Sequence, residues 1–424
     1  MGNTCDNCLI LTALIKNGSV ELARNLSQVN SDNFKGVVSY SGFITVKEQY
    51  NSNMFFWYFP HPEQSKETPW IIWLQGGPGY SSLFGLFILI GPIHLKHDKV
   101  QLRNITWAND YSLLFIDNPV GAGFSFTTDY RGYISDEDAI GEQLYEFLQQ
   151  FVQVFPELHD APLFIAGESY AGKYIPALGI QIHRHREKNH HINLRGMAVG
   201  NGLIDPRSMM HYSDLCKALG ILDTVQLNKV KELETSIVKL IDENKIVNAS
   251  NKFNETIEYI KKQSAVNIYN FHKEPDVNTT QFERFVNRAD VRNWIHVGNA
   301  TYNLNNEIVY QKMLPDIMNS TKPFVEELLE HYGFLCYSGQ LDLLLPYSLS
   351  KYTYQELSWS RQKEYRSAPR KRLRQYPSQA LVGFKKYGGN FMEILIRGAG
   401  HMVPLEQPDV LKFIMDSFIS QFTS

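Results

Sequence analysis

The chain has 424 residues, of which 43% are hydrophobic and 20% are charged, and its formal net charge is −3. This length predicts a large buried core, divided into two or three domains or carrying one insertion. The charge indicates no overall attraction to nucleic acid or to an anionic membrane, and four cysteines are too few for a disulfide scaffold.

The first 30 residues are expected to form an N-terminal arm. The apolar stretch Cys8–Ile15 is short and lacks a preceding basic region, so no signal peptide is visible. Either the true start lies upstream or the usual targeting signal is missing. Cys5 and Cys8 form a Cys-x-x-Cys pair, for which a redox role and half of a zinc site stay open. No second such pair follows at metal spacing.

Asparagine sequons of the form Asn-x-Ser/Thr recur along the chain and indicate a glycosylated protein of the secretory pathway, either secreted or lysosomal. They begin at Asn17, Asn25, Asn104, Asn248, Asn254, Asn278, Asn299 and Asn319.

Short apolar runs that end in Gly, Asn or Asp predict buried strands. These runs are Trp70–Leu74, Ser112–Ile116, Pro162–Ala166, Met197–Val199, Phe334–Tyr337 and Met392–Ile396. Helical patterns lie between some of them, at Asp138–Phe155 and Tyr174–His185. This order predicts an α/β fold, in which a mostly parallel central sheet is flanked by helices on both faces.

Residues 206–315 differ from the rest of the chain, because they are charged, poor in glycine and helical in pattern at Asp223–Asn244 and Phe253–Lys262. They are expected to form an α-rich cap inserted between two parts of the core, residues 31–205 and 316–424. Ser358–Pro377 is rich in Arg and Lys and is expected to be a solvated arm, with polyanion binding as the alternative.

Four histidines occupy a polar helix-to-loop stretch and are expected to be solvated, because no acidic or cysteine partner for a metal accompanies them. They are His183, His185, His190 and His191.

The turn Gly167–Gly172 follows a predicted strand and opens a predicted helix, which is the setting of a nucleophile elbow with Ser169 at its apex. A serine hydroxyl needs a base that is oriented by a carboxylate. Asp342 and His401 each follow a later predicted strand, in the order serine, acid, histidine that α/β-hydrolases use. The sequence therefore predicts Ser169, Asp342 and His401 as a catalytic triad.

Acyl transfer also needs hydrogen-bond donors for the oxyanion. The N–H of Tyr170, directly after the nucleophile, is one expected donor. The loop Gly76-Gly77-Pro78-Gly79, which follows the strand Trp70–Leu74, is expected to supply the second.

Six motifs in one order resemble the serine carboxypeptidase family, and most of all its vitellogenic-like members. They are Gln75–Ser82, Asp117–Ser125, Gly167–Pro176, Gly200–Gly202, Asp342 and Gly400–Pro404. The resemblance extends from about Leu9 to Phe418 and is weakest in the insertion. It implies an α/β-hydrolase fold that removes C-terminal residues from peptides at acidic pH, without a metal or an organic cofactor. Family members include monomers and homodimers.

The resemblance also assigns roles around the triad. It makes Gly77 and Tyr170 the oxyanion donors, and it assigns the substrate's terminal carboxylate to Gly76, Gln75 and Glu168. Gln75 stands where most members have Asn. A protonated Glu168 can donate to a carboxylate, and burial beside an anion raises the pKa of such a group.

Two departures from the family pattern bear on function. The family's second acid falls on Leu89, so half of an acid pair is missing. Altered peptidase activity is the favoured interpretation, and an esterase, an acyltransferase or a non-catalytic binding protein of the same fold are the alternatives. Cysteine is also sparse for this family, and whether Cys216 pairs with Cys336 stays open.

Overall fold

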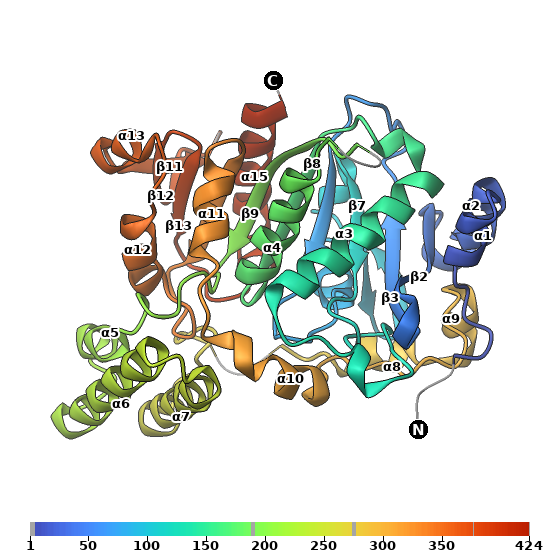
Figure 1. Ribbon diagram of the computed structural model, residues 1–424. Coiled ribbons are helices and arrows are strands. Elements are labelled where there is room, and N and C mark those ends of the chain that lie inside the picture. Colours follow the sequence, from blue (N-terminus) through green and yellow to red (C-terminus); the bar gives the residue numbers. More distant parts are fainter. Residues whose placement is uncertain (1–4, 188–190, 274–276, 376, 424) are drawn as a thin grey trace.

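The computed structural model describes residues 5–187, 191–273, 277–375 and 377–423, and an eleven-stranded sheet runs through its centre (Figure 1). In spatial order the strands are β1 (Gln28–Val29), β2 (Ser39–Lys47), β3 (Ser52–Phe59), β7 (Ser112–Ile116), β4 (Trp70–Leu74), β8 (Leu163–Glu168), β9 (Leu194–Gly200), β10 (Gly333–Gly339), β13 (Phe391–Ile396), β12 (Ala380–Gly388) and β11 (Lys371–Gln375).

The middle of this sheet, from β7 to β13, is parallel throughout, and its two flanks are antiparallel. The parallel strands are buried on both faces, which explains why they appear in the sequence as unbroken apolar runs. The predicted α/β class with a mostly parallel sheet is confirmed. A separate hairpin pairs β5 (Ile93–Lys96) with β6 (Lys99–Leu102).

Helices cover both faces of the sheet. On one face Phe151 of α3 (Glu137–Val154) packs against Phe56 of β3, and α4 (Ala171–Arg184) lies between α3 and α11 (Lys322–Leu329). On the other face Phe418 of α15 (Pro408–Thr423) packs against Phe164 of β8. The remaining helices of the core are α1 (Thr12–Lys16), α2 (Val20–Ser27), α12 (Tyr347–Glu356), α13 (Gln362–Ser367) and α14 (Val403–Glu406). No helix among the described residues combines the length and the apolar character needed to cross a membrane.

In residues 206–315 the described secondary structure is helical. Its helices are α5 (Tyr212–Leu219), α6 (Thr224–Asp242), α7 (Ile246–Ser264), α8 (Thr280–Val286), α9 (Ala289–Trp294) and α10 (Glu307–Ile317). Figure 1 shows α5, α6 and α7 gathered below one end of the sheet, whereas α8 and α9 lie near the N-terminal helices at the other end. The segment therefore runs along the whole lower edge of the sheet.

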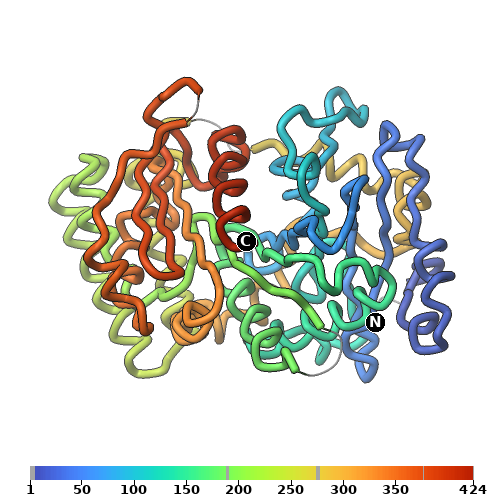
Figure 2. The backbone as a smooth tube through the Cα atoms, turned by 90° about the horizontal axis from the view of Figure 1, so that it is seen from above, coloured from blue at the N-terminus to red at the C-terminus, as the bar shows by residue number. Residues whose placement is uncertain are grey.

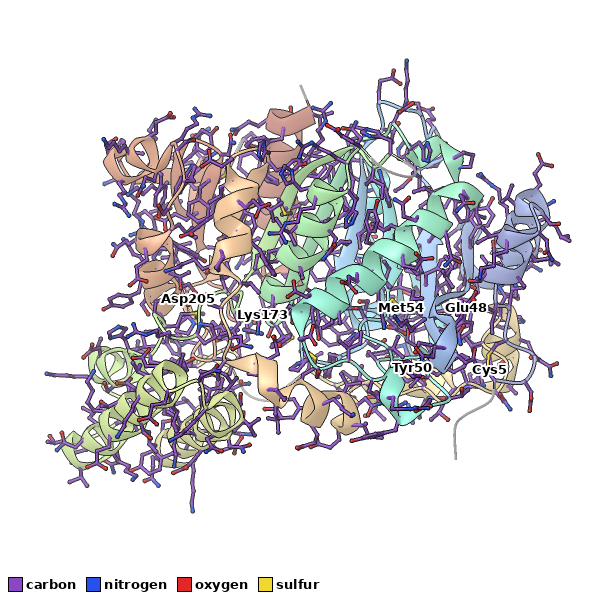
Figure 3. All side chains as sticks on the ribbon, viewed as in Figure 1. Cys5, Glu48, Tyr50, Met54, Lys173 and Asp205 are labelled. Atoms are coloured by element: carbon purple, nitrogen blue, oxygen red, sulfur yellow. A yellow bond between two sulfur atoms is a disulfide. The ribbon has the colours of Figure 1, made fainter. Side chains whose placement is uncertain are left out.

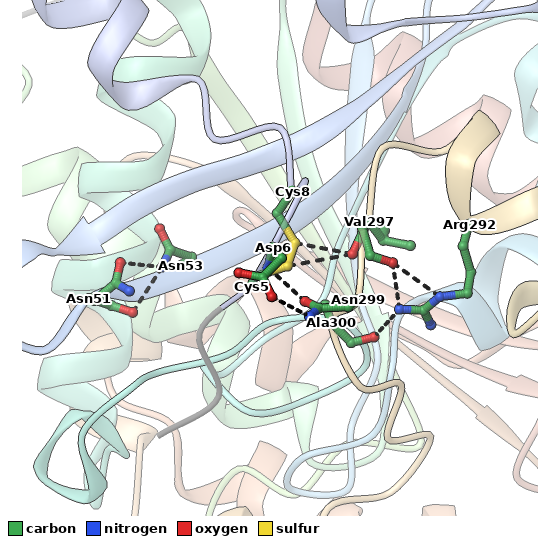
Figure 4. Close-up of a disulfide and its surroundings, with 10 residues drawn as sticks. Cys5, Asp6, Cys8, Asn51, Asn53, Arg292, Val297, Asn299 and Ala300 are labelled. Atoms are coloured by element: carbon green, nitrogen blue, oxygen red, sulfur yellow. Dashed lines mark hydrogen bonds between the residues drawn. A yellow bond between two sulfur atoms is a disulfide. The ribbon is translucent and has the colours of Figure 1, made fainter. Parts of the chain in front are cut away.

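The N-terminal residues are tied to the end of this segment. Cys5 and Cys8 form a disulfide, and the Sγ of Cys8 lies 3.1 Å from the carbonyl oxygen of Val297 (Figure 4). Asp6 and Asn299 exchange two hydrogen bonds, of 2.7 and 3.0 Å. Cys5 and Cys8 therefore form a local disulfide and not half of a zinc site.

Cys216 and Cys336 are both buried and free, so the pairing of these two residues that the sequence left open is not found. The expectation of a solvated arm at Ser358–Pro377 also needs correction. Gln362–Ser367 forms α13, and Lys371–Gln375 forms β11, the edge strand that pairs with β12. The basic side chains hid this strand, because an edge strand does not need an apolar face.

Candidate active site

Ser169 stands at the sharp turn between β8 and α4, with a backbone φ of +64°. A non-glycine residue rarely adopts this left-handed conformation. Its N–H donates to the carbonyl oxygen of Gly200 at 2.9 Å, which fixes the turn to the neighbouring strand. The turn also needs a glycine at position 167, where a Cβ would lie 2.1 Å from the carbonyl oxygen of Leu74. The serine therefore sits at the carboxyl end of the sheet, in the strained geometry of a nucleophile elbow.

His401 and Asp342 meet on the loops that follow β13 and β10. The Nδ1 of His401 lies 2.8 Å from Oδ2 of Asp342, and both side chains are buried. Because Nδ1 faces the carboxylate, Nε2 is the ring nitrogen left to serve a substrate or a serine. His401 and Ser169 line the same cavity.

Asn201 holds Asp342 in place, and the Gly-Asn-Gly motif was the one signal of this role in the sequence. Its Nδ2 donates to Oδ2 of Asp342 at 2.7 Å, and its Oδ1 accepts from the N–H of Gly339 at 3.1 Å. The N–H of Leu344 donates to the other carboxylate oxygen at 2.8 Å. The acid of the proposed triad is therefore fixed through both of its oxygens.

Burial is the largest single effect on His401 and opposes its charged form, but the charge and hydrogen bond of Asp342 together with two further carboxylates outweigh it. The pKa of His401 is accordingly raised above its ordinary value, and Glu168 and Glu406 add to the rise. An imidazole that is stabilised in its charged form suits a group that accepts a proton during the reaction.

The Gly76–Gly77 backbone lies directly against the serine turn. A Cβ on Gly76 would be 2.6 Å from the amide nitrogen of Tyr170 and 2.8 Å from the Cβ of Ser169. Gly77 has a φ of +120°, a backbone angle that residues other than glycine rarely adopt. The two expected oxyanion donors, Gly77 and Tyr170, line one cavity together with Ser169.

Glu168 lies beside the nucleophile with a side chain that is only 1% exposed. Its Oε1 accepts a hydrogen bond of 2.8 Å from Nε2 of Gln75, whose own Oε1 accepts one of 3.0 Å from Trp73. The other oxygen, Oε2, has no hydrogen-bond partner among the described residues. One carboxyl oxygen of Glu168 is therefore held, and the other is buried without a hydrogen-bond partner among the described residues.

Burial raises the pKa of Glu168 to about 7, against the opposing effects of His401 and of the Gln75 hydrogen bond. The charges of Asp342 and Glu406 add to the rise. Below this pH the group is a neutral acid that can donate to a carboxylate.

Leu89 lies in a π-helical turn, Gly85–Leu89, and is buried in an apolar cluster. It is not among the residues that line the cavity at Ser169. Leu89 therefore offers no carboxyl group to Glu168, whose side-chain partner is the neutral amide of Gln75.

Two cavities adjoin Ser169 and share Gly77, Tyr269 and Leu344. The first, of about 310 Å³, is lined by Gln75, Tyr80, Phe84, Glu168, Val277, Thr279, His401 and Met402. The second, of about 260 Å³, is lined by Tyr170, Leu203, Phe253, Asn254, Ile257, Glu258, Ile268, Tyr310, Ile317 and Leu345. The sequence did not reveal the cavity residues between 253 and 310, because they belong to the insertion, where the family resemblance is weakest.

The other residues singled out in the sequence lie away from this site, with one exception. Asn254 lines the second cavity and accepts a hydrogen bond of 2.8 Å from the hydroxyl of Tyr310, whereas the other seven sequon asparagines are exposed. His183 is not solvated as expected, since it is buried on α4 with its Nδ1 3.0 Å from the hydroxyl of Tyr332, and His190 lies outside the described residues. Within the described ranges no group of three or more His, Cys, Asp or Glu side chains could hold a metal ion.

Residues 30–421 match the family described as serine carboxypeptidase. The chain is 39% identical to venom serine carboxypeptidase of Apis mellifera, over 98% of this chain and 90% of that protein. It is 37% identical to vitellogenic carboxypeptidase of Aedes aegypti, over 98% and 89%, and 36% identical to the human probable serine carboxypeptidase CPVL, over 94% and 87%. Among solved structures, the prohormone-processing carboxypeptidase Kex1 of Saccharomyces cerevisiae superposes with a TM-score of 0.83. This match has 22% identity and covers 94% of this chain and 96% of that one, so it supports the fold.

Proposed function

The chain belongs to the serine carboxypeptidase family, and we propose that Ser169, His401 and Asp342 cleave the last peptide bond of its substrates. As a member of this family it is a hydrolase that acts on peptides. The roles of individual residues, the choice of substrate and the location of the protein are the proposals that follow.

The Oγ of Ser169 attacks the carbonyl carbon, and Nε2 of His401 accepts the serine proton. Asp342 holds the imidazole through Nδ1, and the N–H groups of Gly77 and Tyr170 stabilise the oxyanion. His401 then gives its proton to the leaving amine, which departs as a free amino acid. Water, activated by the same imidazole, hydrolyses the acyl-enzyme and restores the serine.

Recognition of a free C-terminus is assigned to Glu168, Gln75 and the Gly76 amide. The observation that carries this assignment is the buried Oε2 of Glu168, which has no hydrogen-bond partner among the described residues while Gln75 holds the other oxygen. Glu168 is also one of the residues that line the cavity at Ser169. A protonated Oε2 donates to the substrate carboxylate in a charge-assisted hydrogen bond. Because this bond requires the neutral acid, peptide hydrolysis is favoured at acidic pH.

The two cavities favour apolar residues on both sides of the cleaved bond. The side chains of Tyr80, Phe84 and Met402 line the cavity that contains Glu168, where the released residue binds. Phe253 and Ile257 of α7 line the second cavity, where the preceding residue binds. We therefore propose that residues 206–315 act as a cap that selects the substrate.

A secretory location, either secreted or lysosomal, is supported by the seven exposed sequons. Asn254 is the exception, since a glycan there would occupy the second cavity. We propose that the seven exposed asparagines are available to carry glycans and that Asn254 does not.

The deciding experiment compares a blocked dipeptide that has a free C-terminal carboxylate with its C-terminal amide, between about pH 4 and 8. A strong preference for the free acid that disappears as the pH rises supports the role of Glu168. Equal or faster cleavage of the amide or of an ester supports the second candidate, an esterase or acyltransferase, which the loss of an acid at Leu89 favours.

The variant Ser169→Ala serves as the control for the nucleophile. It should fold, fail to hydrolyse the dipeptide and fail to react with a fluorophosphonate probe. Hydrolysis near the wild-type rate would rule out Ser169, and a wild-type protein that does not react with the probe would indicate a binding protein.

A further inference from the structure

Positive charge is concentrated at one end of the sheet. Residues 361–397 contain ten Lys and Arg against two Asp and Glu, a net charge of +8 in a chain whose total is −3. Figure 1 shows α13, β11 and β12 together at this end, opposite the N-terminal helices α1 and α2. Figure 2 shows the same segments together at one side of the molecule. The rest of the chain therefore carries a net charge of −11.

Nine of these cations lie on or directly beside α13, β11, β12 and β13, and we call this set the basic edge. Its members are Lys363, Arg366, Arg370, Lys371, Arg372, Arg374, Lys385, Lys386 and Arg397. Seven of them are exposed, and Lys385 and Lys386 are half-buried. Of the two acids in the segment, Glu364 is paired with Arg361 and Glu393 is buried. Among the described residues no ion pair neutralises any of the nine.

Several of these side chains are held in place without losing their charge. Arg374 donates to the carbonyl oxygen of Gln379 at 2.7 Å, Arg366 to that of Gln355 at 3.0 Å, and Arg397 to that of Leu381 at 3.2 Å. The guanidinium carbon of Arg370 lies 4.4 Å from the centre of the Phe384 ring. Neutral partners fix the positions of the cations, so less conformational entropy is lost when an anion binds.

The hairpin also places like charges directly opposite each other. Lys371 of β11 is the cross-strand partner of Lys385 of β12. Two cations in this position destabilise a strand pair. The pKa of Lys385 is lowered, mainly by burial and to a smaller extent by the charge of Lys371. An anion that bridges the two ammonium groups would relieve this repulsion.

We propose that the basic edge binds a linear sulfated polysaccharide. Guanidinium groups match the oxygens of a sulfate group, and closely spaced cations match a chain that carries many of them. Among the described residues of 361–397, which leave out residue 376, the large apolar side chain exposed by more than a third is Tyr387, at 37%, and it lies beside Lys385. These described residues therefore offer little to insert into a bilayer or to stack on nucleic-acid bases. The choice of a polysaccharide over these two polyanions rests on the proposed secretory location.

The test measures binding of the full chain to immobilised heparin in 0.15 M NaCl, with hyaluronan, duplex DNA and phosphatidylserine vesicles in parallel. The variant Lys371→Glu/Arg372→Glu/Arg374→Glu reverses the charge of three exposed side chains on β11. Its matched control, Lys217→Glu/Lys261→Glu/Lys262→Glu, makes the same charge change on α5 and α7, where these three lysines are exposed. We expect heparin affinity to fall at least about tenfold in the first variant and to change less than about threefold in the control.

Dipeptide hydrolysis and thermal unfolding of each variant show that the protein is folded, and they keep this test separate from that of the proposed function. If the β11 variant does not fold, Arg366→Glu/Arg397→Glu replaces it, since both residues lie outside β11. No heparin binding in 0.15 M NaCl, an equal loss in the control, or tighter binding to DNA or vesicles would overturn the proposal.

Discussion

The amide of Gln75 donates to Oε1 of Glu168 at 2.8 Å, so a neutral side chain supports the acid next to the nucleophile. The family resemblance predicts a second carboxyl group near this point, but its place is taken by Leu89, which is buried in an apolar cluster. Two carboxyl groups can share one proton, whereas Glu168 must keep its own. Its protonation therefore depends on burial, which is the largest cause of its raised pKa.

The pH dependence of peptide hydrolysis follows from this arrangement. With the pKa of Glu168 at about 7, kcat/KM for a free-acid dipeptide should fall by about tenfold per pH unit above that value. The corresponding amide should lack this alkaline decline. In Glu168→Gln the amide donor does not titrate, so the decline should also disappear for the free acid. A decline that persists in Glu168→Gln would assign it to another group.

Glu168 should also make stability depend on pH. The unfolded carboxyl group titrates near 4.5 and the folded one near 7, so between these values the folded protein holds a proton that the unfolded chain has released. The free energy of unfolding therefore decreases as the pH rises, by a total of about 3 kcal/mol from this group. The free energy of unfolding of Glu168→Gln minus that of wild type should therefore be larger at pH 8 than at pH 4.5, by about this amount.

Urea unfolding at the two pH values measures this difference, because titrating groups that do not interact with Glu168 cancel between variant and wild type. The exposed Glu63→Gln is the matched control, in which no such change with pH is expected. An equal change in both variants would show that burial of Glu168 is not the cause.

Asn201→Gly tests the support of the proposed triad, because glycine tolerates the φ of +42° at this position and removes only the side chain. Loss of the 2.7 Å hydrogen bond to Asp342 should lower kcat by roughly 10- to 100-fold with little change in KM. More negative charge should then remain on the Asp342 oxygen that faces His401. The acidic limb of the pH profile should consequently move to higher pH. If the variant is less stable but its kcat and the acidic limb of its pH profile are unchanged, Asn201 has only a structural role.

Ile257→Asp tests the proposed selectivity of the second cavity. Ile257 is 8% exposed and lines this cavity together with the acidic Glu258. A second carboxylate should reduce cleavage after Leu or Phe by about tenfold or more and favour Lys or Arg at that position. Kinetics on a set of blocked dipeptides measures the shift. Val247→Asp on the same helix, where the side chain is 40% exposed, is the control and should leave the preference unchanged.

The sequence predicted the parallel centre of the sheet well, because those strands are buried on both faces and appear as apolar runs. Trp70–Leu74 and Ser112–Ile116 agree with β4 and β7 at both ends. Pro162–Ala166 was too short, since β8 extends through Gly167 to Glu168, two residues that look like a turn. The antiparallel flanks were missed, most clearly β11, where charged side chains conceal an edge strand.

For the site, the order of motifs predicted Ser169, Asp342 and His401 on loops that follow neighbouring strands. In the structure His401 contacts Asp342 and lines one cavity with Ser169. Contacts made by side chains from distant segments could not be anticipated. The hydrogen bond from Asn201 to Asp342 spans 141 positions, and the ion pair between the buried Lys173 (Figure 3) and Asp316 spans 143. Such contacts depend on the folded topology and leave no local pattern in the sequence.

The two cavities beside Ser169 have walls of different origin. The predicted triad and the oxyanion loop are built by the core, whereas Phe253, Ile257, Val277 and Thr279 come from the insertion. A mutation in α7 can thus alter which peptides fit without disturbing the reacting groups. This separation allows a single substitution in the insertion to change the preferred peptide while the hydrogen bonds that hold His401 and Asp342 stay intact.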